Sequence, residues 1–486
     1  MTGHVRALMG RGLVAASVLA AVAGMASPVL ARSVTVTPAG GGTWGQAHAL
    51  GMTSPLASAA GVSVVMSCGA AGYCTVAGSV LQGRGDVIRE VAAFRASETR
   101  GTWGRATKIT GFTAVNGRAP VPAAASCPSA SSCLIGGRYF GQGRERPWVS
   151  AEVNGRWHAA EQLPGITALD GPRGATLTSA SCPAAGDCLV GGFYRDAAGH
   201  QQAFVSSQAG GTWGTPAELT GTGALNKGGF ASVTRVSCAS PGNCAAVGTY
   251  SAAKPHVLSF VATEVNGTWQ PAISVPGLAT LDARDAQLNS VSCGSPGNCA
   301  AVGSFNEQAP FAVSEVDGTW QNAVQLQSPA GALPEGQAIT VACASGGQCA
   351  AGGFFYTSDT GHTQAFVATA SNGSWAREEQ VPGIARLGTG AETFSLSCSA
   401  PGDCAAGGFY RGPGPVHLQA FVVSEVNQTW GQAQEVPGTG RLNQNRTGAG
   451  QTSVVSCPAP GRCALAGFYT TRRLLNPFWV FTDSQR

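Results

Sequence analysis

Sixteen cysteines form eight evenly spaced pairs along the chain, and this spacing indicates a repeat architecture. Five residues separate the two cysteines of every pair, and successive pairs begin 50 to 59 residues apart. A fixed period of this length is typical of proteins built from stacked or radially arranged structural units. The pairs are Cys68 and Cys74, Cys127 and Cys133, Cys182 and Cys188, Cys238 and Cys244, Cys293 and Cys299, Cys343 and Cys349, Cys398 and Cys404, and Cys457 and Cys463.

Other residue types keep the same period as the cysteines. Serine precedes the first cysteine of seven pairs, and Ala342 takes its place in the remaining one. Glycine stands four residues after every second cysteine, as at Gly78 and Gly248. A tryptophan recurs with the same step, at Trp44, Trp103, Trp157, Trp213, Trp269, Trp320, Trp375 and Trp430. The chain therefore contains eight copies of a unit of about 55 residues.

Each copy is predicted to supply four short strands. In one copy, residues 289–293 form the first strand, a loop rich in turn formers follows, and residues 299–305 form the second. The third strand is apolar, as in residues 421–425, and an Asn-Gly turn such as Asn266-Gly267 joins it to a fourth that begins at the tryptophan. Four short strands per unit predict radial blades. The expected fold is all-β, an eight-bladed β-propeller with four antiparallel strands per blade.

The two ends of the chain are predicted to meet in the last blade. The last copy lacks its own fourth strand, whereas residues 43–47 closely match residues 429–433. Residues 33–50 would then complete blade eight and remove a sheet edge that would otherwise invite aggregation. We expect residues 32–486 to form a single propeller domain.

The cysteine pairs are predicted to be structural disulfides. Zinc hairpins place two to four residues between their ligands and redox motifs place two, whereas five stand here. Positions i and i+6 flank a hairpin loop and lie opposite each other on adjacent strands, within reach of disulfide geometry. Metal binding or redox chemistry is the alternative.

The N-terminus has the pattern of a secretory signal peptide. Arg6 and Arg11 precede an apolar run over residues 12–26, and small residues follow. This predicts residues 1–31 as the signal peptide, cleaved after Ala31 or alternatively after Ala26. The run is short for a membrane span, and no other stretch approaches the length required. The protein is expected to be secreted and extracellular.

Composition and charge argue against binding to nucleic acid. Charged residues make up 11% of the chain, and the formal net charge is +4 with no basic cluster. A nucleic-acid-binding protein usually carries a basic patch or stripe. No cofactor is predicted. We expect a monomer whose partner is an extracellular glycan or protein.

The order of motifs within a repeat resembles that of kelch repeats. Gly-Gly pairs at 136–137, 191–192, 352–353 and 407–408 close a second strand, and an aromatic residue, an apolar strand, an Asn-Gly turn and a tryptophan follow. Four copies depart from the Gly-Gly pair, and the cysteines are foreign to kelch repeats. The Ser-x-x-Asn-x-Thr-Trp stretch is similar to the Asp-box of sialidase-type propellers, but it lacks the aspartate. The Ser-Cys-x5-Cys-x-x-x-Gly unit resembles repeats of secreted actinobacterial proteins. All three resemblances imply a propeller.

Two groups of residues are candidates for ligand binding on the face formed by the 2–3 and 4–1 loops. Six tyrosines follow the second strand, at Tyr139, Tyr194, Tyr250, Tyr356, Tyr410 and Tyr469. Four histidines come next, at His200, His256, His362 and His417. The tyrosines either cap the strand ends or form aromatic platforms for a glycan or peptide. The histidines are expected to be solvated loop residues, with metal ligation as the alternative.

Two further sets of residues have a structural and a functional interpretation. Asp170 and Asp282 occupy matching places, and we expect turn formation there rather than acid catalysis. Four asparagines head sequences that resemble N-glycosylation sites, and most of these coincide with the hairpin turn. They are Asn266, Asn372, Asn427 and Asn445.

The repeats show no cluster of unlike residues that would indicate a catalytic centre. Acid, base and electrophile differ in role, so a catalytic site on a propeller must break the repeat symmetry. The sequence therefore favours a secreted, non-catalytic binding or scaffold protein. The alternative is an extracellular carbohydrate-active enzyme or metal-dependent oxidase with a site at the propeller axis. It would need paired carboxylates about 5–9.5 Å apart, or a histidine cluster.

Overall fold

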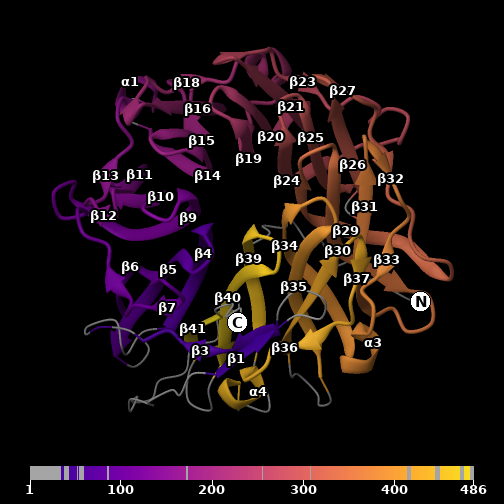
Figure 1. Cartoon of the computed structure of the whole chain (residues 1–486). Helices are drawn as coiled ribbons and strands as arrows, with labels where there is room; N and C mark the ends of the chain where they lie inside the picture. The colour runs from indigo at the N-terminus through magenta and orange to yellow at the C-terminus, as the bar shows by residue number, and fades with distance from the viewer. Residues whose placement is uncertain are drawn as a thin grey trace, which may run out of the picture.

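The computed structural model shows a β-propeller in which repeated sheets stand radially around a centre (Figure 1). It describes residues 34–37, 43–51, 53, 60–84, 87–170, 173–253, 256–306, 308–412, 418–443, 449–470 and 475–481. The predicted signal peptide, residues 1–31, lies outside these ranges.

Seven blades of one design occupy the described residues. Each has four antiparallel strands, and the fourth is broken into two short pieces that both pair with the third. The strands are, blade by blade, β4 (Ala60–Ala70), β5 (Tyr73–Arg84), β6 (Val87–Thr99), β7 (Thr102–Trp103) and β8 (Thr107–Lys108); β9 (Gly117–Ser129), β10 (Ser132–Gly141), β11 (Arg144–Val153), β12 (Arg156–Trp157) and β13 (Glu161–Gln162); β14 (Ala175–Ala184), β15 (Asp187–Arg195), β16 (Gln201–Ala209), β17 (Thr212–Trp213) and β18 (Ala217–Glu218); β19 (Ala231–Ser240), β20 (Asn243–Ala253), β21 (His256–Val265), β22 (Thr268–Trp269) and β23 (Ile273–Ser274); β24 (Ala286–Ser295), β25 (Asn298–Phe305), β26 (Ala309–Val316), β27 (Thr319–Trp320) and β28 (Val324–Gln325); β29 (Ala332–Ala344), β30 (Gln348–Thr357), β31 (Thr363–Ser371), β32 (Ser374–Trp375) and β33 (Glu379–Gln380); β34 (Thr389–Ala400), β35 (Asp403–Arg411), β36 (Leu418–Val426), β37 (Thr429–Trp430) and β38 (Gln434–Glu435).

The sheet between the last repeat and the N-terminal segment differs from these seven. It contains β39 (Gln451–Ala459), β40 (Arg462–Thr470), β41 (Leu475–Phe481) and β3 (His48–Ala49), in the order β3-β41-β40-β39. The tryptophan strand β2 (Thr43–Gln46) pairs with β1 (Val34–Thr37) and not with this sheet. The prediction of an eight-bladed propeller is therefore wrong. Seven blades of this design are found, because only β3 of the segment assigned to an eighth joins β41, whereas β2 pairs with β1.

All sixteen cysteines form disulfides within their own pairs, as the spacing predicted. The two cysteines of a pair face each other across the first two strands of a sheet, with their Cα atoms 3.9 to 4.0 Å apart. The eight disulfides join Cys68 to Cys74, Cys127 to Cys133, Cys182 to Cys188, Cys238 to Cys244, Cys293 to Cys299, Cys343 to Cys349, Cys398 to Cys404, and Cys457 to Cys463.

These disulfides exclude the metal and redox alternatives for the cysteines. All sixteen cysteines lie in the described ranges, and none of them is free. Zinc binding and thiol chemistry both require a thiolate, which a sulfur in a disulfide cannot supply. Eight disulfides are consistent with an extracellular protein, because such bonds persist in oxidising compartments.

The glycine four residues after each second cysteine is required by close packing within the sheet. Gly248 lies opposite Phe260, and a Cβ atom on this glycine would come within 2.6 Å of the phenylalanine ring. Gly78 and Phe94 form the same pair in another blade. Phe94 and Phe260 are fully buried. A Cβ would also come within 2.0 Å of a first-strand carbonyl oxygen at Gly248 and 2.4 Å at Gly78, so only glycine fits here.

The serine before the first cysteine links each sheet to the next. Its hydroxyl accepts a hydrogen bond of 2.9 to 3.0 Å from the backbone N–H of the first cysteine in the following repeat. The donor and acceptor pairs are Cys127 and Ser67, Cys182 and Ser126, Cys238 and Ser181, Cys293 and Ser237, Cys343 and Ser292, Cys457 and Ser397, and Cys68 and Ser456. The last pair joins the final repeat to the first. We call this set of bonds the serine belt. One position differs, because Ala342 has no hydroxyl group to accept a bond from the N–H of Cys398.

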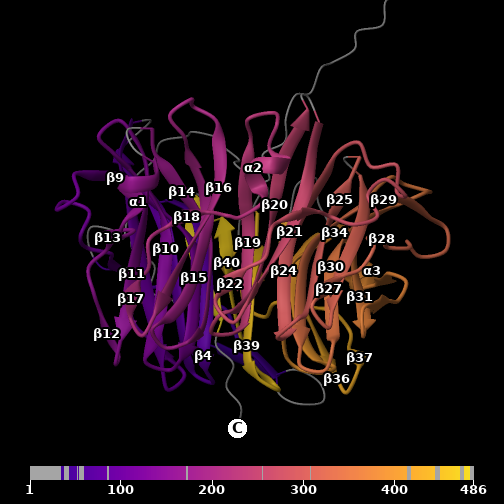
Figure 2. The same cartoon turned by 90° about the horizontal axis from the view of Figure 1, so that it is seen from above.

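The loops separate the propeller into two unlike faces. One-turn helices α1 (Ile166–Asp170), α2 (Thr222–Leu225), α3 (Ile384–Leu387) and α4 (Thr439–Leu442) follow the fourth strand of their blades. Figure 2 shows α1 and α2 toward one face. The predicted Asn-Gly hairpins are confirmed, since Asn266 and Gly267 both have positive φ, as a type I′ turn requires. Within the described ranges, no helix has the length and apolar character needed to cross a membrane.

Candidate binding crevice between two blades

Most of the tyrosines predicted as ligand platforms are core residues. Five have only 2 to 6% of their surface exposed, and they are Tyr139, Tyr194, Tyr250, Tyr410 and Tyr469. Tyr194 and Tyr410 donate hydrogen bonds of 2.9 and 2.8 Å to glutamates on the outer part of the same blade. Burial, together with these carboxylates, raises the pKa of both hydroxyls. A ligand-binding role stays a prediction, but these buried rings offer no face for stacking.

Tyr356 does not share the position of the other five tyrosines. The residue two positions after the recurring glycine is Phe305 in one blade and Phe355 in the next, and both are buried. Tyr356 follows one residue later and is partly exposed. Tyrosine or phenylalanine occupies this position in seven copies and Val80 in the first, and all of these side chains are buried, as the strand-capping interpretation expects.

The histidines predicted as ligand candidates are exposed where the structure describes them, and they belong to different blades. His200 is 3.6 Å from Asp196 in its own loop, and His256 is 3.5 Å from Asp285. His362 is exposed on another blade, and His417 lies outside the described residues. Over the described ranges, no three side chains of His, Cys, Asp or Glu are grouped as metal ligands.

The two aspartates and the predicted glycosylation sequons have structural roles where the structure describes them. Asp170 is buried and accepts a bond of 2.6 Å from Arg146, an ion pair within one blade. Asp282 has a positive φ of 50° at a turn. Asn266, Asn372 and Asn427 also have positive φ, at the hairpin turns. Asn445 lies outside the described residues.

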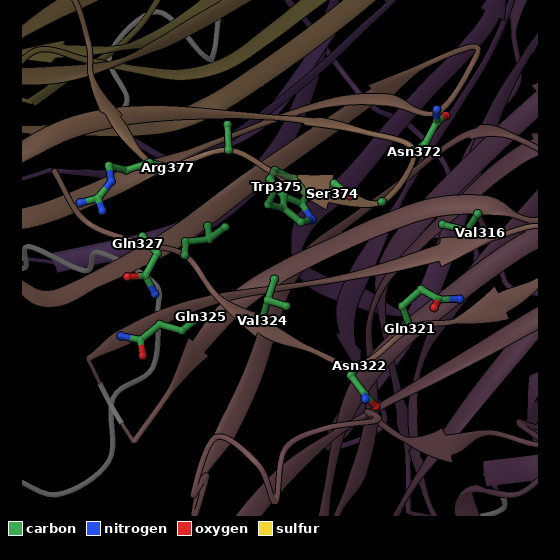
Figure 3. Close-up of a pocket in the computed structure, with 13 residues that line it drawn as sticks. Val316, Gln321, Asn322, Val324, Gln325, Gln327, Asn372, Ser374, Trp375 and Arg377 are labelled. Carbon is green, nitrogen blue, oxygen red and sulfur yellow. The ribbon is translucent and has the colours of Figure 1, made fainter.

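A crevice of about 470 Å³ lies between the blade β24–β28 and the blade β29–β33, along their outer strands. Figure 3 shows Trp375 near its middle, with Arg377 toward one end and Asn372 toward the other. Gln325 and Gln327 line the facing side. The Trp375 indole N–H donates to the Ser314 hydroxyl of the neighbouring blade at 3.1 Å, which fixes the ring across the joint. We call this feature the Trp375 crevice.

The end of the Trp375 crevice departs from the repeat. The residue three positions after the recurring tryptophan is a buried alanine in six copies and Pro216 in one, but Glu378 here. Its backbone N–H donates to Gln327 at 3.0 Å, as Ala323 donates to Pro276 in the preceding joint. Ser328 follows Gln327 where a glycine follows the proline in that joint. The alanine and glycine that meet in the preceding joint are thus replaced here by Glu378 and Ser328.

Glu378 is a buried acid without a charged partner. Only 2% of its surface is exposed, and neither its carboxyl oxygens nor the Ser328 hydroxyl has a hydrogen bond of acceptable geometry among the described residues. Burial raises the pKa of Glu378 to about 8, and the nearby Ser328 hydroxyl opposes that rise. The preceding residue, Arg377, is exposed and donates to the Ser328 carbonyl at 2.7 Å. Arg377 is therefore the charged side chain at this end of the crevice, next to an acid that burial favours in its neutral form.

A second, smaller cavity of about 290 Å³ lies at the disulfide turns of the blades β29–β33 and β34–β38. Glu425 lines it and is almost fully buried, so its pKa is raised to about 7, with nearby Asp403 adding to the rise. Glutamates recur at this place in the repeat, for example Glu264 and Glu315. The position therefore follows the repeat, unlike Glu378.

The break in symmetry at Glu378 was visible in the sequence but was missed. Comparing the eight copies at the third residue after each tryptophan shows one charged residue among alanines and a proline. The tyrosines and histidines were predicted as candidates from their residue types and their shared place in the repeat. The informative signal was instead a polar residue at a position that the other copies keep small and apolar.

No family model and no curated protein matches the chain. Among solved structures, the fucose-specific lectin from Aleuria aurantia is 13% identical, covers 65% of this chain and 95% of its own, and has a TM-score of 0.33. The β-propeller domain of the Trilobed protease from Pyrococcus furiosus is 7% identical over 78% and 97%, with a TM-score of 0.41. An ulvan lyase of polysaccharide lyase family PL25 is 10% identical over 93% and 96%, with a TM-score of 0.41. The likeness is one of fold alone, and the kelch-like and Asp-box assignments stay predictions.

Proposed function

We propose that the protein is a secreted, non-catalytic carbohydrate-binding propeller whose ligand lies in the Trp375 crevice. The observation that supports this most directly is an indole held in a crevice that five amide side chains also line. Sugars present C–H faces that pack on aromatic rings, and hydroxyl groups that bond to amides. A concave site with an apolar surface and a few convergent polar groups is the usual form of a small-ligand site.

The composition of the crevice favours binding over hydrolysis. Its described lining includes Gln321, Asn322, Gln325, Gln327 and Asn372, and contains no aspartate or glutamate. Most glycoside hydrolases act through a pair of carboxyl groups that flank the scissile bond. The site lies along the outer strands between two blades, and its described lining includes none of the tyrosines and histidines predicted to bind a ligand.

The indole is positioned before any ligand arrives. Ser314 bonds its N–H, and the apolar side chains of Val316 and Val324 line the same crevice. Val324 is 44% exposed, so an apolar surface is available to a ligand. A ring already fixed in place loses little conformational entropy when a ligand packs against it.

The proposal is tested by screening the secreted protein on a glycan array and then titrating the best ligand by calorimetry. Stacking on one aromatic ring contributes roughly 1–3 kcal/mol, by analogy with bases on aromatic side chains. Trp375→Ala should therefore weaken binding by about 5-fold to 150-fold. Trp269→Ala is the matched control, because this tryptophan has the same place in another blade and lies outside the crevice. A protein that binds no glycan, or binds equally after Trp375→Ala, would refute the proposal.

A further inference from the structure

We propose that the Trp375 crevice selects sugars that carry an anionic group, a carboxylate or a sulfate ester, and that Arg377 binds this group. The inference rests on the proposed function, because it specifies the ligand of the same site.

Arg377 is the one charged side chain among the described residues that line the crevice. It makes no ion pair with any described residue, and its side chain is exposed. One guanidinium nitrogen donates to the Ser328 carbonyl at 2.7 Å, which holds the group at the end of the crevice. A guanidinium has five N–H donors in a planar fork, so most remain available to a ligand. Carboxylates and sulfates match that fork with paired hydrogen bonds.

The neighbouring acid leaves this charge uncompensated. Glu378 follows Arg377 directly, and burial keeps its carboxyl group protonated at neutral pH because it raises the pKa to about 8. An ionised glutamate at this place would attract the guanidinium and repel an anionic ligand. The buried, neutral acid does neither, so Arg377 is available to bind an anionic group of a ligand in the crevice.

Comparison with the other repeats shows that this cation is not imposed by the fold. The residue two positions after the tryptophan is neutral in six copies: Gln46, Ala159, Thr215, Pro271, Asn322 and Gln432. Arg105 is the other cation, and it precedes the ordinary Ala106. Arginine, glutamate and serine depart from the repeat together only at residues 328, 377 and 378. Three departures at one joint are the asymmetry that selective recognition of a ligand requires.

The test compares acidic and neutral saccharides of matched linkage and length. Tetragalacturonate is titrated against galactotetraose, and a sulfated galactan oligosaccharide is titrated against its desulfated form, by calorimetry at about 0.15 M salt, where exposed charges are largely screened beyond about 8 Å. The acidic member of at least one pair should bind about tenfold to a hundredfold more tightly, as expected for a charge-assisted, paired hydrogen bond. The pair that shows the preference identifies the anionic group as carboxylate or sulfate.

Arg377→Gln should abolish the preference, so that the acidic and the neutral member of a pair bind this variant with equal affinity. Arg441→Gln is the matched control, because it removes one exposed positive charge from a different blade and should change neither affinity. Equal binding of acidic and neutral saccharides, or a preference that survives Arg377→Gln, overturns this inference and leaves carbohydrate binding intact. If Trp375→Ala loses binding to all saccharides and the other variants do not, the site is supported. If the unmodified protein binds no saccharide, the proposed function itself is refuted.

Discussion

Replacing Glu378 with glutamine should remove a large pH dependence of stability. The folded protein binds the Glu378 proton more tightly than the unfolded chain does, because burial raises its pKa from 4.5 to about 8. Below pH 4.5 both states are protonated and the acid has no electrostatic cost. As the pH rises toward 8, the unfolded chain gains from ionisation and the folded protein does not, so the free energy of unfolding falls.

The magnitude follows from the size of the pKa shift. At 1.36 kcal/mol per unit, ionisation of Glu378 lowers the free energy of unfolding by about 3 kcal/mol at pH 7 and by roughly 5 kcal/mol at most above pH 8. Glu378→Gln keeps the side-chain volume and therefore opens no cavity. The variant should match the native protein near pH 4.5 and become progressively more stable than it up to pH 9.

Urea unfolding followed by tryptophan fluorescence at pH 5, 6, 7, 8 and 9 measures this difference as a shift in midpoint at unchanged slope. Glu379→Gln is the control, since Glu379 is the exposed next residue and should leave the pH dependence as it is. Glu392 and Glu425 also have raised pKa values, of about 7, but they titrate equally in both proteins and cancel in the comparison. Parallel curves for the native protein and Glu378→Gln would show that the carboxyl group is hydrated or paired in solution, and the reasoning would fail.

Four further substitutions test the serine belt and the tyrosines. Ala342→Ser should supply the missing hydroxyl opposite Cys398 and raise the free energy of unfolding by about 1 kcal/mol, whereas Ser292→Ala should lower it by a similar amount; urea midpoints that move in the same direction for both would contradict the belt. Tyr410→Ala should cost about 3–5 kcal/mol, as for other large-to-small changes in cores. Tyr410→Phe should cost only about 1 kcal/mol, from the bond to Glu435; an unchanged melting temperature for Tyr410→Ala would show that the ring is not part of the core.

Much of the fold could be predicted because it depends on local, repeated chemistry. A cysteine pair at i and i+6 and an Asn-Gly turn each specify a hairpin within a few residues, and both predictions are confirmed. The number of blades could not be predicted in the same way. It depends on which partner the strand of Trp44 finds, and that strand is free to pair with β1 as well as with a distant repeat.

The candidate site was harder to predict because it lies between repeats. Glu378 and Gln327 are 51 positions apart, and the hydrogen bond between their backbones exists only once two blades pack side by side. The burial of the tyrosines could not be predicted for a related reason. Burial at the end of a strand depends on the neighbouring blade, which a single repeat does not show.

The serine belt also has a consequence for the order in which the molecule assembles. The bond from Cys68 to Ser456 joins residues 388 positions apart, so it cannot form until nearly the whole chain has been synthesised. Until then the first blade lacks the neighbour that covers Met66 and Val76, whose core cluster includes Ala464 and Ala466. Closing so long a loop adds little to the equilibrium cost, since that cost grows only slowly with length. The cost is kinetic, because an apolar flank of the first blade stays uncovered, and prone to aggregation, until the last repeat has been made.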